Sequence, residues 1–130
     1  MQQETAPLVL VVDDYDDARE MYAESLLVFG FRVAEASNGI EAIERARTLT
    51  PDVILMDLSL PGLDGWEATR RLKADERTRH IPIVALTGHA LASAMTAARQ
   101  AGCDGFVIKP ALPDTVVEEV RQAMQRRASV

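Results

Sequence analysis

Five short apolar runs alternate along the chain with segments of helical periodicity. The expected strands lie at 8–12, 31–36, 53–57, 81–86 and 104–108, and the expected helices at 16–29, about 39–49, 64–74, 91–101 and 113–127. Apolar runs separated by helices of about ten residues or more favour parallel strands joined by right-handed crossovers, with helices on both faces. The sequence therefore predicts one doubly wound α/β domain.

Several local signals mark the ends of these elements. Asn38 and Glu41 have the spacing of a capping box, and Gly30 stands where a helix C-cap is expected. Pro82 can stand only at the start of its strand, where no ladder donor is needed. The helical period predicts inward-facing stripes at Ala18, Met21, Tyr22, Ser25, Leu26 and Phe29; Ile40, Ile43, Ala46 and Leu49; Trp66, Thr69 and Leu72; and Val116, Val117, Val120 and Met124.

Composition and charge exclude several classes of protein. The 130 residues carry a formal net charge of −6, which argues against general nucleic-acid binding because that needs a basic surface. A single cysteine, Cys103, rules out an internal disulfide and is expected to be a small buried residue. The first seven residues lack a basic n-region, and the apolar run after Pro7 is too short for a signal peptide or a membrane span. We expect a cytoplasmic protein that binds neither nucleic acid nor membrane.

Charged or polar side chains follow four of the five expected strands. They are Asp13 and Asp14 after the first strand, Asp57 at the third, Thr87 at the fourth and Lys109 at the fifth. Because the carboxyl ends of parallel strands lie at one edge, where open α/β sheets bind ligands, we expect these side chains to meet. Three neighbouring carboxylates repel one another unless a cation compensates them. Mg²⁺ suits this set, since it binds one or two carboxylates and leaves room for phosphate oxygens.

The same residues indicate phosphoryl chemistry. A carboxylate that faces a metal, a hydroxyl and an ammonium can attack a phosphoryl group, which makes Asp57 the candidate acceptor. Thr87 can donate a hydrogen bond to a phosphate oxygen, and Lys109 can offset its charge. Each residue also has an ordinary structural explanation, as a capping acid, a loop acid, a turn hydroxyl or a lysine that extends to water. Their coincidence at one edge favours the phosphoryl site.

In this order and spacing, the residues resemble the receiver domain of two-component response regulators. The likeness runs from Leu8 to Met124 and includes the loop 60–65, Leu-Pro-Gly-Leu-Asp-Gly, where the family usually has Met before Asp-Gly. It implies a flavodoxin-like three-layer sandwich with five parallel strands in the order 2-1-3-4-5. The start at Met1 and the end just after the last expected helix favour a stand-alone protein, similar to single-domain chemotaxis regulators. We expect an N-terminal extension at 1–7, the receiver domain at 8–127 and a tail at 128–130.

By this resemblance, Asp57 accepts a phosphoryl group from a phosphohistidine on a sensor histidine kinase or a histidine phosphotransfer protein. Mg²⁺, or Mn²⁺ in its place, is bound directly by Asp14, Asp57 and the backbone carbonyl of Ser59. Asp13 is expected to act on the metal mainly through water. The chain is expected to catalyse only its own phosphorylation and dephosphorylation, and not to be an enzyme with a separate substrate.

The resemblance further implies a switch that responds to phosphorylation. Thr87 and Lys109 bind the phosphoryl oxygens, and the Lys109–Pro110 peptide bond is cis. Phe106 occupies the position of an aromatic switch residue. Its ring is expected to turn inward as Thr87 moves toward the phosphate.

The output partner, or a second copy of the chain, is expected to dock on one face, formed by the helix at 91–101, the strand at 104–108 and the helix at 113–127. Between residues 90 and 101 the only charge is Arg99, and apolar residues occur on every side. Excess apolar surface suggests a partner contact, with Ala94 and Ala98 exposed on it. The alternative is that alanines are good formers of surface helices.

A function from another class stays open, an aspartate-based phosphohydrolase similar to the haloacid dehalogenases. Asp14 would be its nucleophile, with Asp16 completing an Asp-x-Asp pair. Against this reading, that family usually has Thr or Val where Ala18 stands, and it usually needs a cap insertion for which 130 residues leave little room. The intact acidic set disfavours an inert scaffold. No glycine-rich loop follows the first strand, which argues against nucleotide or flavin binding.

Overall fold

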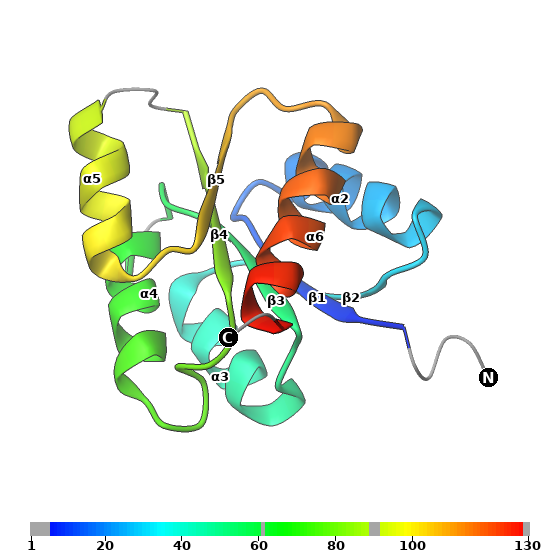
Figure 1. The fold of residues 1–130 in the computed structure, drawn as a ribbon. Helices are drawn as coiled ribbons and strands as arrows, with labels where there is room; N and C mark the ends of the chain where they lie inside the picture. Colours follow the sequence, from blue (N-terminus) through cyan, green and yellow to red (C-terminus); the bar gives the residue numbers. More distant parts are fainter. Residues whose placement is uncertain (1–5, 61, 89–91, 129–130) are drawn as a thin grey trace.

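The computed structural model describes residues 6–60, 62–88 and 92–128, and its centre is one parallel sheet. The strands are β1 (Leu8–Val12), β2 (Arg32–Ala36), β3 (Val53–Asp57), β4 (Ile83–Thr87) and β5 (Gly105–Ile108), paired in the order β2-β1-β3-β4-β5 (Figure 1). Helices α2 (Asp16–Val28), α3 (Gly39–Leu49), α4 (Gly65–Ala74), α5 (Ala92–Ala101) and α6 (Pro113–Ala128) connect and follow them. The predicted fold class and strand order are confirmed.

Two helical layers enclose the sheet, because each strand sends alternate side chains to opposite faces. Leu10 and Val12 pack with α3, α4 and α5, whereas Val9 and Val11 pack with α2 and α6. Figure 1 shows these two groups of helices on either side of the strands. All residues of β3 and β4 are buried, as expected for strands covered on both faces.

The helices bury more small residues and fewer large ones than their sequence periodicity predicts. Four positions predicted to face inward are substantially exposed, namely Met21, Phe29, Ile40 and Leu49. Ala23 and Ala42 are buried instead, since a short side chain lets a helix lie close to the sheet. The periodicity indicates the centre of each buried stripe but not its edges, so the prediction that residues at the edges are buried was wrong. In α6 the prediction held, with Val116, Val117 and Val120 buried and Met124 packed against them.

In the described part of helix α5, from residue 93 to residue 101, none of the exposed side chains is apolar, in contrast to the predicted apolar surface. Ala98 is fully buried against the sheet, and Ala94 is partly buried. Among the described side chains between 93 and 101, the exposed ones are all polar: Ser93, Thr96, Arg99 and Gln100. The alanines bring α5 close to the sheet, which is why Ala98 is a core residue and the expectation of its exposure was wrong.

The predicted caps are present, with one change of partner. Asn38 accepts a hydrogen bond from the Glu41 N–H at 2.8 Å, but Glu41 in return accepts from the N–H of Ser37, one residue before the cap. Gly30 has φ +94° after α2, a conformation that favours glycine at a helix C-terminus. Strand β4 begins at Ile83, directly after Pro82, rather than at residue 81. Across the described residues, none of the helices is both long and apolar enough to cross a membrane.

Candidate functional site

Four strands deliver polar side chains to the carboxyl edge of the sheet, as the sequence predicts. Val12 pairs with Met56, so Asp13 and Asp57 follow side by side, and Asp57 in turn pairs with Leu86, the residue before Thr87. Asp13, Asp57 and Thr87 are almost completely buried, with exposed fractions of 0%, 3% and 3%. An ionised carboxylate is costly at such a position unless it is paired or hydrogen-bonded.

Lys109 provides that pairing. Its Nζ lies 3.1 Å from Asp13 Oδ2 and 3.1 Å from Asp57 Oδ2, so a single ammonium joins the two buried carboxylates. The backbone N–H of Lys109 donates to the Thr87 carbonyl at 2.8 Å, and the following peptide bond to Pro110 is cis, as predicted. The end of β5 is therefore held against the end of β4 with the lysine directed at the acids.

Backbone N–H groups hold the second oxygen of each buried carboxylate. The Ser59 N–H donates to Asp57 Oδ1 at 2.9 Å, and the Tyr15 N–H donates to Asp13 Oδ1 at 3.0 Å. Both carboxylates are thus oriented by a fixed donor on one oxygen and by Lys109 on the other. This orientation is local, because each backbone donor lies two residues after its acid.

Gly65 allows helix α4 to approach the loop that carries Asp57. A Cβ atom at this position would lie 2.6 Å from the Leu58 Cα and would collide with the Asp57 carbonyl. The Gly65 N–H donates to the Leu58 carbonyl at 3.3 Å, and Asp64 caps the helix by accepting from the Glu67 N–H at 2.8 Å. Residue 65 must lack a side chain for this loop and helix to lie in contact.

The electrostatics of the site are those of carboxylates in excess. Burial acts to lower the pKa of Lys109, but the charges of Asp57 and Asp13 outweigh it and raise this pKa above its usual value. Burial also raises the pKa of Asp13; the Tyr15 N–H opposes this, and the charge of Asp57 adds to it. Asp14 adds a third, exposed carboxylate, so the one ammonium leaves the cluster negative.

The donor set fits a hard divalent cation. Carboxylate oxygens of Asp13, Asp14 and Asp57 lie within 4.8 Å of one another, close enough for one ion to contact them. Oxygen ligands with surplus negative charge are those that Mg²⁺ and similar ions prefer. Ser59 contacts the cluster because its backbone N–H donates a hydrogen bond to Asp57. That its carbonyl is a metal ligand stays a prediction.

Asp13→Asn is expected to raise the melting temperature of the metal-free chain by a few degrees at pH 7. Because the folded pKa of Asp13 is raised, the folded state binds this proton more tightly than the unfolded state. The stability from this group is present below the unfolded pKa and is lost as pH rises through the folded pKa. Thermal unfolding in chelator should show the gain at pH 7 and none at about pH 3. A variant that melts at or below the wild-type temperature at pH 7 would contradict the argument.

Fold and site together define a class of small α/β domains whose carboxyl edge joins an acidic cluster to a lysine. The family model of the response regulator receiver domain matches residues 9–121, and the chain belongs to this family. It is 34% identical over 113 residues to the polar-differentiation response regulator DivK of Brucella anthropi, covering 87% of this chain and 92% of that protein.

Solved structures agree with this assignment. A putative response regulator from Chloroflexus aurantiacus is similar with a TM-score of 0.89 and 32% identity, over 93% of this chain and 99% of that one. The receiver domain of a sensor histidine kinase from Pseudomonas aeruginosa, with a magnesium ion coordinated in its active-site cleft, has a TM-score of 0.85 and 32% identity, over 92% and 98%. The alternative of a haloacid-dehalogenase-type phosphohydrolase is not supported, since the whole domain matches receivers.

Two arginines near the predicted residues were not anticipated from the sequence. Arg99 places its guanidinium carbon 5.1 Å from the ring centroid of Phe106, which is partly buried against the core. Arg19 donates to the backbone carbonyl of Asp13 at 3.0 Å. Arg99 and Phe106 lie on different elements, so no local pattern predicts their contact. Arg19 lies on α2 and pairs with Asp16 on the same helix and with Glu35 on β2, but helical spacing does not predict its bond to the Asp13 carbonyl.

Proposed function

We propose that Asp57 is the phosphoacceptor of this receiver domain and takes its phosphoryl group from a phosphohistidine on a partner protein. The observation that carries the proposal is the position of Asp57, buried at a strand end with Lys109 Nζ 3.1 Å from Oδ2. Receiver domains interact with histidine kinases or phosphotransfer proteins in two-component signalling, the setting to which this family belongs. These observations support Asp57 as the acceptor, and in this proposal the chain acts on no separate substrate.

The transfer forms one bond and breaks one. A carboxylate oxygen of Asp57 attacks phosphorus, the bond from phosphorus to the histidine ring nitrogen breaks, and its electron pair stays on that nitrogen. The product is an acyl phosphate on Asp57, and the partner ring, which carries a proton on its other nitrogen, leaves as a neutral imidazole. Lys109 contacts the attacking carboxylate at 3.1 Å and would offset charge on the incoming phosphoryl oxygens, and Thr87 would supply a hydroxyl from the end of β4.

Mg²⁺, or Mn²⁺ in its place, is the metal we propose for the acidic cluster. Asp14, Asp57 and the Ser59 carbonyl would hold it directly and Asp13 through water. When bound, the ion offsets the charge of the carboxylates and of the phosphoryl oxygens. The oxygen donor set of this chain supports the proposal, as does the magnesium ion in the related Pseudomonas aeruginosa receiver domain.

Phosphorylation of Asp57 is proposed to act through Thr87, Phe106 and Pro110. A phosphoryl group adds about 1.5 to 2 negative charges, and moving a two-state equilibrium from 1:99 to 99:1 takes about 5.5 kcal/mol. Hydrogen bonds to charged groups contribute roughly 1.5–3 kcal/mol each, so a few new bonds, with those from Thr87 and Lys109 among them, supply a free energy of this order. We propose the face of α5, β5 and α6 as the surface that the output partner or a second copy reads.

Further parts of the assignment remain proposals. We place the receiver domain at 8–127, with an extension at 1–7 and a tail at 128–130. A cytoplasmic location fits a domain that receives phosphoryl groups from kinases and phosphotransfer proteins. The net charge of −6 argues against a role for nucleic acid.

Mapping the phosphoryl group tests the proposed function. The chain is incubated with acetyl phosphate and Mg²⁺, and the modified residue is found by peptide mass spectrometry after trapping of the acyl phosphate with hydroxylamine. We expect one phosphoryl group on Asp57, and none when a chelator replaces Mg²⁺. A label on Asp14, or steady hydrolysis of added phosphomonoesters, would contradict the proposal.

A further inference from the structure

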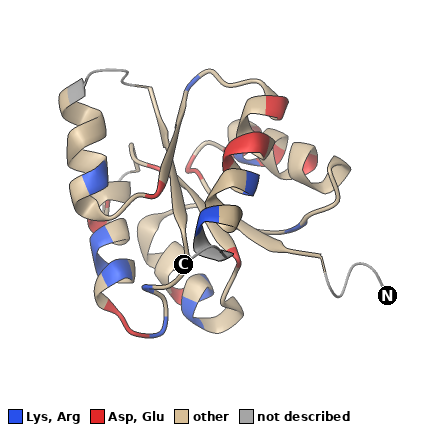
Figure 2. Cartoon of the chain, in the orientation of Figure 1, with Lys and Arg blue, Asp and Glu red and all other residues tan. Residues whose placement is uncertain are grey.

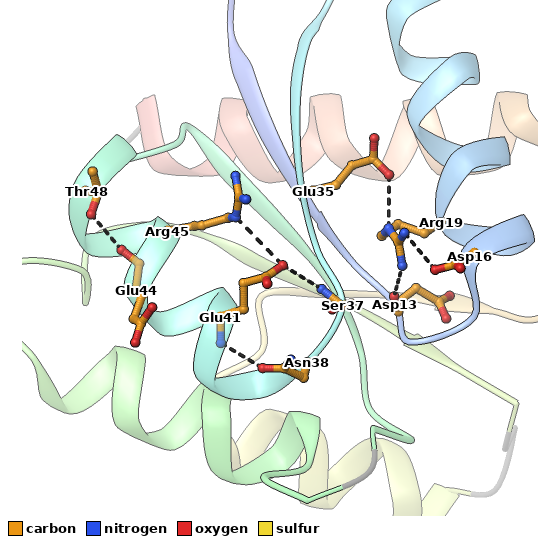
Figure 3. A network of polar contacts seen from close by, with 10 residues as sticks. All are labelled: Asp13, Asp16, Arg19, Glu35, Ser37, Asn38, Glu41, Glu44, Arg45 and Thr48. Carbon is orange, nitrogen blue, oxygen red and sulfur yellow. Dashed lines mark hydrogen bonds and ion pairs between the residues drawn. The ribbon is translucent and has the colours of Figure 1, made fainter.

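Arg19 joins three separate parts of the chain beside the acidic cluster. Its Nη1 donates to the backbone carbonyl of Asp13 at 3.0 Å, its Nε pairs with Glu35 on β2 at 3.0 Å, and its Nη2 pairs with Asp16 at 2.8 Å. Figure 3 shows the guanidinium between these three groups. The Arg19 side chain is only 14% exposed, whereas those of Glu35 and Asp16 are 42% and 75% exposed.

The contact with Asp13 matters because of what it does to the next residue. Asp14 is exposed. Among the described residues, none forms a hydrogen bond or ion pair with its carboxylate. Its position is therefore set by the backbone on either side. On one side the Asp13 carbonyl is held by Arg19, and on the other the Tyr15 N–H is held by Asp13 Oδ1 at 3.0 Å. Removing Arg19 leaves the Asp13 carbonyl without this donor, so only the Tyr15 side of Asp14 stays held.

We propose that Arg19 is a positioning residue for the metal site, which holds Asp14 in place through the Asp13 carbonyl. The inference rests on the proposed function, because it assigns Arg19 a part in the binding of the divalent cation. Side chains that hold metal ligands in place typically change metal affinity by about 10- to 100-fold when they are removed. Arg19 never touches the metal in this scheme and acts only through the turn after β1.

The chemistry of the contact requires an arginine. Three donors of one planar guanidinium point to three acceptors, in the turn after β1, on β2 and on α2, an arrangement that a lysine ammonium cannot reproduce. Glu35 and Asp16 balance the positive charge, so Arg19 does not repel a cation bound nearby. Edge strand β2 thereby becomes part of the metal site without supplying a ligand.

Calorimetric titration of the full chain with Mg²⁺ tests the inference. Arg19→Ala is expected to weaken Mg²⁺ binding by about tenfold, and Arg19→Lys to fall between this variant and the wild type. The matched control is Arg45→Ala, which removes an exposed arginine that pairs with Glu41 at 3.8 Å in the same region and does not contact Asp13. Its Mg²⁺ affinity should equal that of the wild type.

Phosphorylation provides a second measurement that a purely structural role would not move. With acetyl phosphate in excess, Arg19→Lys should need more Mg²⁺ for half-maximal rate, and its rate at saturating Mg²⁺ should approach that of the wild type. Wild-type Mg²⁺ affinity in folded Arg19→Ala or Arg19→Lys would overturn the inference while leaving phosphorylation of Asp57 intact. A wild-type chain that binds no Mg²⁺ would overturn both this inference and the proposed metal, and the titration of the wild type alone reveals that case.

Discussion

Asp57→Asn is expected to lower the rate of phosphorylation by at least roughly 10³-fold, the scale seen when a catalytic nucleophile is lost. The asparagine oxygen can still accept from the Ser59 N–H, which bonds Asp57 Oδ1 at 2.9 Å in the wild type. The amide is a poor nucleophile, however, and it cannot form the acyl phosphate. Acetyl phosphate labelling in the presence of Mg²⁺ measures the loss.

Asp17→Asn is the matched control for this experiment. Asp17 is an exposed acid in the first turn of α2, on the helix that begins beside the acidic cluster, and its replacement should leave the labelling rate unchanged. Circular dichroism should show that Asp57→Asn keeps the fold. The substitution neutralises one of the two buried carboxylates that face Lys109, and the ammonium keeps Asp13 as its partner. Undiminished labelling of folded Asp57→Asn would mean that another residue is the acceptor.

Lys109→Met is expected to slow phosphorylation by about 10²- to 10³-fold, the scale of removing one group that stabilises charge in a transition state. Methionine keeps most of the length of the side chain and removes the ammonium. Mg²⁺ binding should persist or strengthen. The Lys109 ammonium contacts Asp13 and Asp57 in the wild type and therefore competes with the metal for these carboxylates. Loss of rate with retained Mg²⁺ affinity separates the role of the lysine from that of the metal ligands.

The only other lysine of the chain supplies the control. Lys73 Nζ donates to the Ile81 carbonyl at 2.8 Å and pairs with Asp104 at 3.1 Å, at the opposite edge of the sheet where β4 and β5 begin. Figure 2 shows that α4, from which it extends, carries several basic segments. Lys73→Met should lower stability without changing the labelling rate. Equal loss of rate in both variants would show that general destabilisation, not the ammonium at the site, is the cause.

Lys109→Met should also lower stability at pH 7. The pKa of Lys109 is raised in the folded state, so its stabilising effect is fully present below the unfolded pKa of about 10.5 and is lost as pH rises through the folded value. Without the ammonium, two buried carboxylates lack their cation. We expect the free energy of unfolding to fall by roughly 1–3 kcal/mol, less than for a fully buried pair because the Lys109 side chain is 27% exposed. Urea unfolding should show this loss, and Mg²⁺ should reverse part of it.

Much of the fold was predictable because its signals are local. Short apolar runs with polar ends predict parallel strands, and the carboxyl ends of such strands share an edge. This is why the sequence alone predicts that Asp13, Asp57 and Thr87 lie together, as the strand pairing confirms. The predictions failed where closeness of packing decided the result. Ile40 is exposed and Ala98 is buried because the helices lie near the sheet along their small residues, and hydrophobicity alone does not rank alanine above isoleucine for that role.

The sequence alone determined which residues gather at the functional edge, since strand length and chain order place each strand end there. Only the tertiary structure decided which atoms meet. Lys109 reaches both Asp13 and Asp57 across 96 and 52 positions, and Arg19 reaches the Asp13 carbonyl while its charge is balanced on β2. The direction of a long charged side chain depends on the positions of all its acceptors at once. Those positions exist only after the sheet and its helices have assembled.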